Sequence, residues 1–354
     1  MILKPSAANR STTVLVTGGS GLIGSHCVAQ LLKLGYQVRT TVRSASREKA
    51  VVEMMKTAKL VDEISRLSFF QADLTSDKGW YEATAGCDYV LHVASPFPVE
   101  NPPHEDDLII PAREGSLRAL RFARDAKVKR VVITSSIVAI TFGVDHRDHV
   151  FTERDWSDLS LASDQSYVKS KTLAEKAAWD FVEKEGQGLE LAVINPTGVL
   201  GPILGPCASS SIGIIASLLS GRMARGAPNL MFGVVDVRDI ADLHIRAMVT
   251  PAANGERFLA TNKVMTVLEI SEIIKDYHPN YENKLPSQVI PSWMVWLASW
   301  ISSQAKMLYP QLGIRRTSDN SKAKRILDWE PIPIEKTIAD TIEPLEQYGN
   351  KSSV

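Results

Sequence analysis

The chain has few cysteines, no excess of charge of either sign, and no repeat or low-complexity segment. Lysine and arginine together number 40, as do aspartate and glutamate. This balance, without a charge run, argues against nucleic acid or an acidic membrane surface, so we expect neither as a partner. The cysteines are scattered and outside metal-ligand spacings, which predicts buried thiols of a reducing compartment and no metal site; they are Cys27, Cys87 and Cys207.

The chain also lacks a long apolar run. No segment has the roughly 20 apolar residues of a membrane span, and residues 1–11 contain no apolar core of a secretory signal, so we expect a cytoplasmic protein. The nearest candidate is segment 289–301, which is too short, contains Pro291 and is followed by polar residues. We interpret it as a buried helix of a second lobe rather than a membrane or partner surface, and the sequence alone leaves the partner alternative open.

What is present is an ordinary globular composition over 354 residues, 44% apolar and 23% charged. Strand and helix patterns alternate down the first half, which predicts an α/β fold with a doubly wound parallel sheet, a Rossmann domain. The predicted strands are 13–17, 37–42, 67–71, 89–93, 130–134 and 189–194, and the predicted helices are 22–34, 47–59, 105–126 and 165–185.

The pattern changes after residue 195, where a stretch rich in glycine and proline leaves the sheet. Residues 234–262 are sheet-like again, and residues 263–354 are helical and contain tryptophan. We therefore predict a dinucleotide-binding domain made of 12–195 plus 234–262. The remainder, 196–233 plus 263–354, is predicted to form a smaller, discontinuous C-terminal substrate-binding lobe.

The first predicted strand runs into a glycine-rich turn, and a helical pattern follows at once. Glycine permits the tight turn and lets a pyrophosphate approach the backbone, while the helix N-terminus offers free N–H groups and a positive dipole end. Strand, glycine turn and helix in this order predict a dinucleotide site. Its expected contacts are Thr17, Gly18, Gly21, Leu22, Ile23 and Gly24.

The segment after the second predicted strand indicates which dinucleotide binds. An NAD site normally places an acidic residue about 20 residues past the glycines, but no acidic residue lies between Ser25 and Arg47. An arginine there pairs with a 2′-phosphate through a fork of donors. The sequence therefore favours NADP(H) over NAD(H), with Arg43 as the first candidate ligand and Ser44 and Arg47 in support.

A second group of residues carries acid-base chemistry. Tyr167 and Lys171 are four apart and share one face of a predicted helix. A nearby ammonium favours the phenolate and is expected to bring the tyrosine pKa toward the working range. The stretch from Thr134 to Ser136 ends the fifth predicted strand, where a serine can hydrogen-bond a substrate carbonyl.

With these motifs, the chain resembles the extended short-chain dehydrogenase/reductase family over nearly its whole length. The matching segments are 17–24, 73–75, 167–171, 195–196, 235–241 and 320–331. Within the family it is most similar to the branch of dihydroflavonol reductases, cinnamoyl-CoA reductases and aldehyde or methylglyoxal reductases. That narrower similarity rests on residues 41–43, 92–97 and 170–179.

The resemblance implies roles for individual residues. Tyr167 would donate a proton to the carbonyl oxygen, Lys171 would bind the nicotinamide ribose and lower the tyrosine pKa, and Ser136 rather than Ser135 would polarise the carbonyl. Further residues would contact the cofactor: Asp73 and Leu74 at the adenine, Ala94 and Ser95 on the nicotinamide-ribose side, and Asn195 and Pro196 beside the nicotinamide ring. Thr134 is a further predicted cofactor contact.

The segment after Ser136 departs from the plant flavonoid enzymes of the branch. It is apolar and lacks the polar residue expected to hold a flavonoid hydroxyl. This suggests a modest, largely apolar aldehyde or ketone as substrate. The candidate pocket wall, for each member of which plain core packing remains an alternative, consists of Phe97, Ile137, Phe142, Ile203 and Ile212.

These observations predict an NADPH-dependent carbonyl reductase with a Ser-Tyr-Lys triad, acting as a monomer or homodimer. The alternative on the same scaffold is a nucleotide-sugar epimerase or dehydratase with tightly bound NAD, which the basic stretch after the second predicted strand disfavours. A non-catalytic cofactor sensor is disfavoured by the presence of Tyr167 and Lys171. The physiological substrate, the stereochemistry and any use of NADH stay open at this stage.

Overall fold

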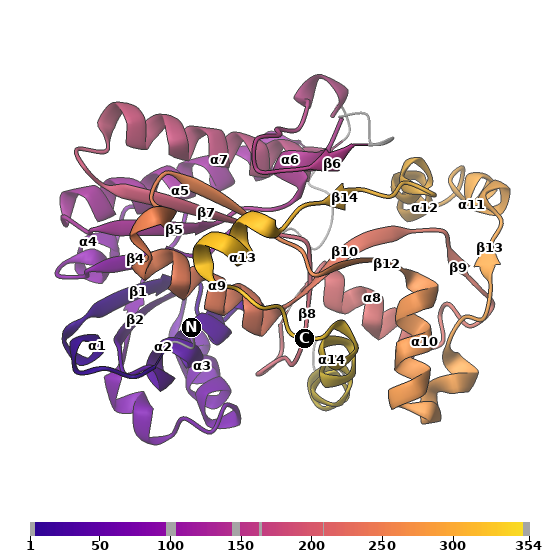
Figure 1. Cartoon of the computed structure of the whole chain (residues 1–354), viewed down its shortest axis with the longest axis horizontal. Coiled ribbons are helices and arrows are strands. Elements are labelled where there is room, and N and C mark those ends of the chain that lie inside the picture. The colour runs from indigo at the N-terminus through magenta and orange to yellow at the C-terminus, as the bar shows by residue number, and fades with distance from the viewer. Residues whose placement is uncertain (1–3, 97–103, 144–148, 163–164, 208, 350–354) are drawn as a thin grey trace.

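Seven parallel strands form the central sheet, in the spatial order β3-β2-β1-β4-β5-β7-β11 (Figure 1). The computed structural model describes residues 4–96, 104–143, 149–162, 165–207 and 209–349. The sheet confirms the predicted doubly wound α/β architecture. Its strands are β1 (Thr13–Thr17), β2 (Gln37–Val42), β3 (Leu67–Gln71), β4 (Tyr89–His92), β5 (Arg130–Thr134), β7 (Glu190–Pro196) and β11 (Glu256–Ala260).

The central strand β1 shows why these short apolar runs form strands. Val14 and Val16 pack in the larger hydrophobic cluster on one face, while Leu15 packs in a second cluster on the other. All three side chains are fully buried. A strand covered on both faces needs apolar residues at every position, which is the pattern of a parallel sheet enclosed by helices.

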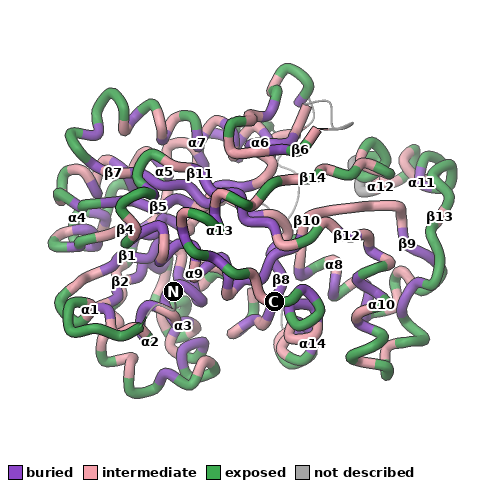
Figure 2. The backbone as a smooth tube through the Cα atoms, in the orientation of Figure 1, coloured by how far each residue is buried: buried purple, intermediate pink, exposed green. Residues whose placement is uncertain are grey.

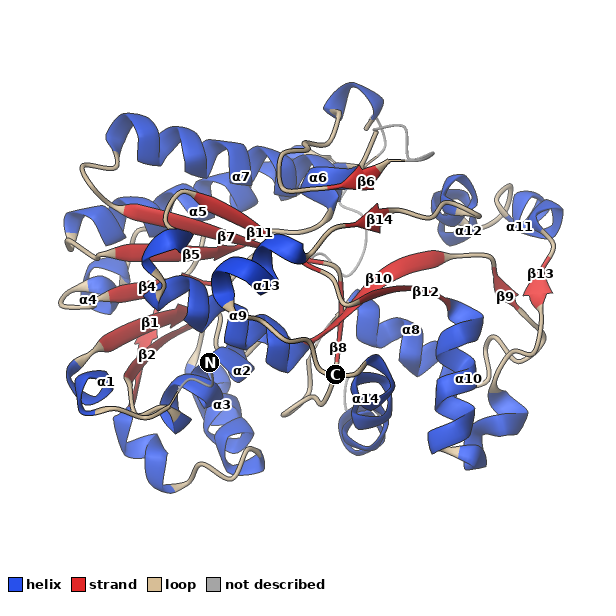
Figure 3. Cartoon of the chain, viewed as in Figure 1, coloured by secondary structure: helices blue, strands red, loops and turns tan. Residues whose placement is uncertain are grey.

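Helices cover both faces of this sheet (Figure 3). One face packs against a pair of long helices that contact each other, α5 (Asp106–Asp125) and α7 (Ser166–Glu185). The other packs against α2 (Leu22–Lys33) and α9 (Val237–Val249). The flanks carry α1 (Ala7–Ser11), α3 (Ala45–Thr57), α4 (Trp80–Thr84) and α6 (Val138–Thr141). The predicted helices agree with α2, α3, α5 and α7 to within two residues at each end.

A separate three-stranded sheet lies beside the first, in the order β12-β10-β8. Its strands are β8 (Gly198–Leu200), β10 (Met231–Asp236) and β12 (Lys263–Thr266). The sequence prediction assigned residues 234–262 to the domain of the large sheet. Of that stretch, β11 joins the large sheet and α9 packs against it, whereas β10 does not. An apolar run predicts a strand without specifying its neighbours, and β10 finds its neighbours in β8 and β12.

The remaining elements surround this small sheet or bridge the two lobes (Figure 1). The helices are α8 (Ser210–Leu219), α10 (Val267–Tyr277), α11 (Ser292–Ala298), α12 (Ser303–Leu308), α13 (Ser321–Leu327) and α14 (Ile334–Gly349). Two short parallel pairs join β9 (Ala227–Pro228) to β13 (Val289–Ile290) and β6 (Val150–Phe151) to β14 (Thr317–Ser318). The 3-10 turns are Asp62–Arg66, Leu159–Leu161, Pro251–Ala253, Pro279–Lys284 and Tyr309–Gln311.

The apolar segment 289–301 differs from the sequence prediction. It contains the helix α11, as expected, but the helix is not buried (Figure 2). Within α11 only Val295 is buried, whereas Trp293 is 62% exposed. The prediction of a buried helix is therefore wrong. Hydrophobicity alone does not determine whether the rest of the protein covers a helix. Among the helices of the described ranges, none combines the length and apolar content needed to cross a bilayer.

Candidate active and cofactor site

The glycine-rich turn lies directly against the first turn of α2. Gly18 has a left-handed backbone (φ +70°), and its carbonyl oxygen accepts a hydrogen bond from the Gly21 N–H at 3.0 Å. A Cβ on Gly24 would lie 2.2 Å from that same oxygen, so only glycine permits this approach. Gly21 caps α2 without a side-chain hydrogen bond. The amides of the first turn, including those of Leu22 and Ile23, are thus not capped by a side chain, as a phosphate site requires.

Thr17 joins the turn to the end of the neighbouring strand β4. Its buried hydroxyl lies 3.0 Å from His92 Nδ1 and accepts hydrogen bonds from the amides of Val93 and Ala94 at 3.1 and 3.0 Å. Through these hydrogen bonds, the Thr17 hydroxyl holds the ends of β1 and β4 together. Thr17 therefore positions the glycine turn, and a Cβ on Gly18 would come within 3.0 Å of the Ala94 Cα.

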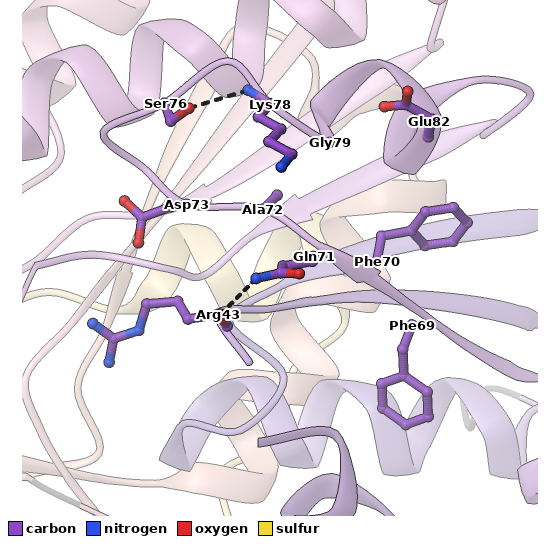
Figure 4. A pocket seen from close by; sticks show the side chains of 10 residues that line it. All are labelled: Arg43, Phe69, Phe70, Gln71, Ala72, Asp73, Ser76, Lys78, Gly79 and Glu82. Atoms are coloured by element: carbon purple, nitrogen blue, oxygen red, sulfur yellow. Dashed lines mark hydrogen bonds between the residues drawn. The ribbon is translucent and has the colours of Figure 1, made fainter. Parts of the chain in front are cut away.

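A cavity of about 410 Å³ opens where β2 and β3 end (Figure 4). Arg43 follows β2 and lines this cavity with an exposed guanidinium for which the described residues provide no recorded hydrogen bond or ion pair. Ser44 caps α3 through its backbone, its hydroxyl meets that of Ser46 at 2.8 Å, and Arg47 lies exposed on the first turn of the same helix. Of the three predicted phosphate ligands, Arg43 lines the cavity, whereas Ser44 and Arg47 lie at the start of α3 and are not among its lining residues.

Asp73 lines the same cavity. Hydrogen bonds from Thr75 lower the pKa of its carboxyl group, and the nearby Arg43 guanidinium adds to the effect. Leu74 instead packs toward α5, where a Cβ on Gly115 would contact it at 3.0 Å. The predicted adenine contacts are therefore split, with Asp73 at the cavity and Leu74 turned toward the helix.

The predicted catalytic residues meet where β5 and α7 come together. Ser136 follows the end of β5, and Tyr167 is the second residue of α7. Their side chains are hydrogen-bonded, and this bond opposes the burial that raises the tyrosine pKa. The neighbouring Ser135 faces away, because its hydroxyl donates to the buried carboxylate of Glu175. Ser136 is therefore the serine that bonds to Tyr167, and its role at the substrate carbonyl stays a prediction.

Lys171 lies one helical turn after Tyr167. Its Nζ atom donates to the Ser95 hydroxyl at 3.0 Å and sits 5.9 Å from the centre of the tyrosine ring. Burial lowers the pKa of Lys171 to about 8, against the opposing effect of Glu175. Burial raises the pKa of Tyr167, and the Ser136 hydrogen bond opposes that shift. The lowering of this pKa by Lys171, which the resemblance implies, stays a prediction.

Thr134 and Asn195 lie close to the triad but are directed inward. The Thr134 hydroxyl meets His244 Nε2 at 2.6 Å, and the Asn195 amide donates to the Ser136 carbonyl at 3.2 Å. Pro196 ends β7, and its carbonyl accepts from the Ile137 amide at 2.9 Å. These contacts fix the ends of β5 and β7. Through these contacts Thr134, Asn195 and Pro196 support the site. Their contact with the cofactor stays a prediction.

Sequence reasoning missed the buried ion pair beneath the triad. Glu175 is 2% exposed and bonds to the Arg257 Nε atom of β11 at 2.5 Å. The same carboxylate accepts from Ser135 and, at 2.8 Å, from the Asn195 amide. Its position one turn after Lys171 on α7 was the available signal. These donors satisfy the buried carboxylate, which in turn fixes the strand ends around it.

The predicted pocket wall divides into three groups. Ile203 and Ile212 are 3% and 4% exposed inside the main core, so packing accounts for them. Ile137 and Phe142 are partly exposed at the two ends of α6, the helix that follows Ser136. Phe97 lies outside the described residues.

Comparison with known proteins agrees with this arrangement. The family described as "NAD dependent epimerase/dehydratase family" matches residues 14–260. A cinnamoyl-CoA reductase of Medicago truncatula is 34% identical over 347 residues, covering 97% of this chain and 98% of the relative. A putative NADPH-dependent methylglyoxal reductase of Candida albicans is 32% identical over 353 residues, covering 94% and 98%.

Solved structures show the same likeness. The yeast methylglyoxal/isovaleraldehyde reductase Gre2, complexed with NADPH, superposes with a TM-score of 0.80 at 25% identity, covering 96% of this chain and 99% of that one. Gre2 of Candida albicans in complex with NADPH gives 0.76 at 29% identity, covering 95% and 99%. The chain therefore belongs to the NAD dependent epimerase/dehydratase family, which corresponds to the extended short-chain dehydrogenases/reductases predicted from its motifs.

Proposed function

We propose that this protein is an NADPH-dependent carbonyl reductase that converts an aldehyde or ketone to an alcohol. The observation that carries the proposal is the hydrogen-bonded pair of Ser136 and Tyr167, with Lys171 anchored beneath it on Ser95. Ser136 follows the end of β5, at the same edge of the sheet as the glycine turn, and Tyr167 reaches it from α7. Open α/β sheets bind their ligands at this edge. The reductases named among the relatives support the same activity.

The residues present fit a dinucleotide, because the approach of Gly24 to Gly18 leaves a backbone cradle that a Cβ would fill. Reduced nicotinamide, when bound, supplies a hydride to the carbonyl carbon. Ser136 donates a hydrogen bond to the carbonyl oxygen as negative charge develops there. Tyr167, hydrogen-bonded to Ser136, gives the same oxygen its proton. The Lys171 ammonium then stabilises the phenolate that remains.

We propose NADP(H) rather than NAD(H) as the cofactor. Arg43 presents an exposed guanidinium at the cavity, and hydrogen bonds from Thr75 already occupy the nearby Asp73 carboxylate. A 2′-phosphate accepts paired hydrogen bonds from a guanidinium, whereas an unphosphorylated ribose does not. The putative NADPH-dependent methylglyoxal reductase of Candida albicans and the yeast Gre2 complex with NADPH support this assignment.

For the substrate we propose a modest, largely apolar aldehyde or ketone. Ile137 and Phe142, at either end of the helix α6 that follows Ser136, are partly exposed apolar side chains. Relatives named for methylglyoxal and isovaleraldehyde support a small carbonyl compound. We further propose a cytoplasmic enzyme that acts as a monomer or homodimer.

The test is loss of the reduced-nicotinamide absorbance, with NADPH and NADH assayed in parallel. Substrates would include aliphatic and aryl aldehydes, α-ketocarbonyls, a dihydroflavonol and a nucleotide sugar. We expect NADPH consumption with the simple carbonyls. Conversion of the nucleotide sugar by protein that retains bound NAD, without consumption of any carbonyl, would establish the epimerase/dehydratase alternative instead.

The Tyr167→Phe variant tests the assigned mechanism. Without the phenol proton, we expect a loss of kcat of at least about a hundredfold, with NADPH binding nearly unchanged. The matched control is Tyr81→Phe, which removes the hydroxyl from an exposed tyrosine on α4. Turnover that survives in Tyr167→Phe would show that another group donates the proton.

A further inference from the structure

An apolar stripe runs along the exposed side of α11 and the turn after it. We call this stripe the tryptophan face; its members are Trp293, Trp296, Leu297, Trp300 and Ile301. Their spacing of i, i+3, i+4, i+7 and i+8 brings them to one side of a helical path. Trp300 is 73% exposed and Ile301 is 93% exposed. Figure 2 shows α11 at the end of the smaller lobe, away from the seven-stranded sheet.

Contacts on the inner and the outer side of α11 hold the tryptophan face in place. Val295 is buried on the inner side of α11 and anchors the helix to the lobe. On the outer side, the rings of Trp296 and Trp300 pack edge to face with their centres 5.4 Å apart. A contiguous group of exposed aromatic side chains marks a surface that binds a membrane or another protein.

Two segments near the tryptophan face carry basic residues and no acidic ones. Segments 219–229 and 284–314 contain no aspartate or glutamate. The two segments are neighbours in space, since β9 pairs with β13 and the Gln288 amide donates to the Arg225 carbonyl at 3.1 Å. Their four cationic residues are all exposed, and the described residues provide no recorded ion pair for them; they are Arg222, Arg225, Lys284 and Lys306.

This end of the lobe contrasts with the rest of the chain, which has equal numbers of positive and negative residues. The acidic residue next to it, Glu282, is already paired with Lys275. A partner surface that matches the region must therefore be apolar at its centre and negatively charged around it.

We propose that the tryptophan face docks on an anionic lipid bilayer, with α11 lying in the interface between headgroups and acyl chains. Tryptophan prefers this interface, because its ring is apolar and its indole N–H is polar. Lysine and arginine around it bind lipid phosphates and carboxylates. A symmetric contact between two copies would instead bring the same cations together without acidic partners. This proposal departs from the sequence expectation of no membrane partner. It places the proposed enzyme at a membrane surface.

The experiment is co-sedimentation of the full chain with vesicles. One set contains phosphatidylcholine with phosphatidylserine, and the other contains phosphatidylcholine alone. We expect binding to the anionic vesicles, weakened by high salt, with a blue shift of tryptophan fluorescence. The double variant Trp300→Ser and Ile301→Ser should bind at least about tenfold more weakly, because both exposed apolar side chains are lost.

Two controls keep the result interpretable. Val61→Ser changes an apolar residue that is 61% exposed elsewhere, and it should leave vesicle binding unchanged. Arg222→Gln with Arg225→Gln should weaken binding to anionic vesicles and reduce its dependence on salt. Carbonyl reduction measured without lipid should be the same in all variants, which separates this inference from the proposed function.

Either of two outcomes overturns the proposal. The first is absence of sedimentation with both vesicle types by the unmodified chain. The second is a dimer in light scattering that Trp300→Ser with Ile301→Ser converts to a monomer, which would identify the face as a contact between copies of this chain.

Discussion

Ser135 and Ser136 are adjacent in sequence, yet their hydroxyls serve different partners. Ser136 bonds to Tyr167, whereas Ser135 donates to Glu175. Successive residues at a strand end point to opposite sides, so one hydroxyl faces the site and the other faces the buried ion pair. At the residue scale, the function of a side chain here depends on which side of the backbone it leaves.

Arg43 gives a prediction at the same scale. Arg43→Ala should raise the KM for NADPH about tenfold to a hundredfold, because a charge-assisted hydrogen bond to the 2′-phosphate is lost. The KM for NADH should change little, and steady-state kinetics with both cofactors measures the difference. Lys56→Ala, which removes an exposed cation at the far end of α3, serves as the control. An equal effect on both cofactors in Arg43→Ala would place this residue away from the 2′-phosphate.

At the scale of elements, the glycine turn and α2 form one unit. The 2.2 Å approach of a Gly24 Cβ to the Gly18 oxygen means that any side chain must push the turn from the helix. The backbone amides of the turn would then lose their common direction, on which phosphate binding depends. The closeness of the packing is therefore a requirement of cofactor binding as well as of stability.

Gly24→Ala tests this unit. We expect a loss of about 1–3 kcal/mol in the free energy of unfolding, together with weaker NADPH binding measured by fluorescence titration. The matched control is Gly213→Ala on α8, where a Cβ meets nothing within 4 Å. That variant should gain about 0.5–1 kcal/mol, because alanine restricts the unfolded chain. Normal cofactor binding by Gly24→Ala would contradict the role given to the close approach.

At the scale of the whole molecule, three buried histidines join parts of the fold. Burial lowers the pKa of His26 and His244 to about 4 and that of His92 to about 3. All three are therefore neutral in the folded state at neutral pH. In the unfolded chain they take up protons below a pKa of about 6.5. Stability is thus fully present above that pH and falls as the pH approaches 4.

Urea unfolding at a series of pH values measures this loss. We expect about 1.4 kcal/mol per pH unit for each histidine between pH 6.5 and 4. His244→Gln should reduce the slope by about one proton, whereas His104→Gln, at an exposed position, should leave it unchanged. An unchanged slope in His244→Gln would mean that this histidine is protonated in the folded protein.

Much of the large sheet could be predicted from the sequence, because strands enclosed by helices are short apolar runs and their helices repeat at 3.6 residues. The Ser-Tyr-Lys group was predictable for a related reason: its members lie at strand ends and on one helix face. Features that depend on distant partners were not. Glu175 meets Arg257 across 82 positions of sequence, and no local pattern encodes such a pairing.

The cap of α9 and the tryptophan face show two further limits. The sequence predicts Asp239 as the cap of a helix that begins at Ile240, and this prediction is wrong. The helix α9 begins at Val237 and is capped by Asp236, whose side chain accepts from the Arg238 amide. Asp239 instead receives the Ile332 amide from the chain's C-terminal part, a contact that the local sequence does not contain. The exposure of Trp300 is a second example, because the apolar composition of segment 289–301 fits a buried helix and an exposed one equally well.

The main hydrophobic cluster has a consequence for synthesis of the chain. It contains Val14 and Val16 of β1 together with Leu327, Trp329 and Ile338 from near the C-terminus. A ribosome makes β1 well before Leu327, Trp329 and Ile338, so the cluster lacks these partners until the chain between them has been translated. The nascent chain therefore presents an unfinished apolar surface throughout translation, and chaperones that shield such surfaces have the longest access to the β1 region.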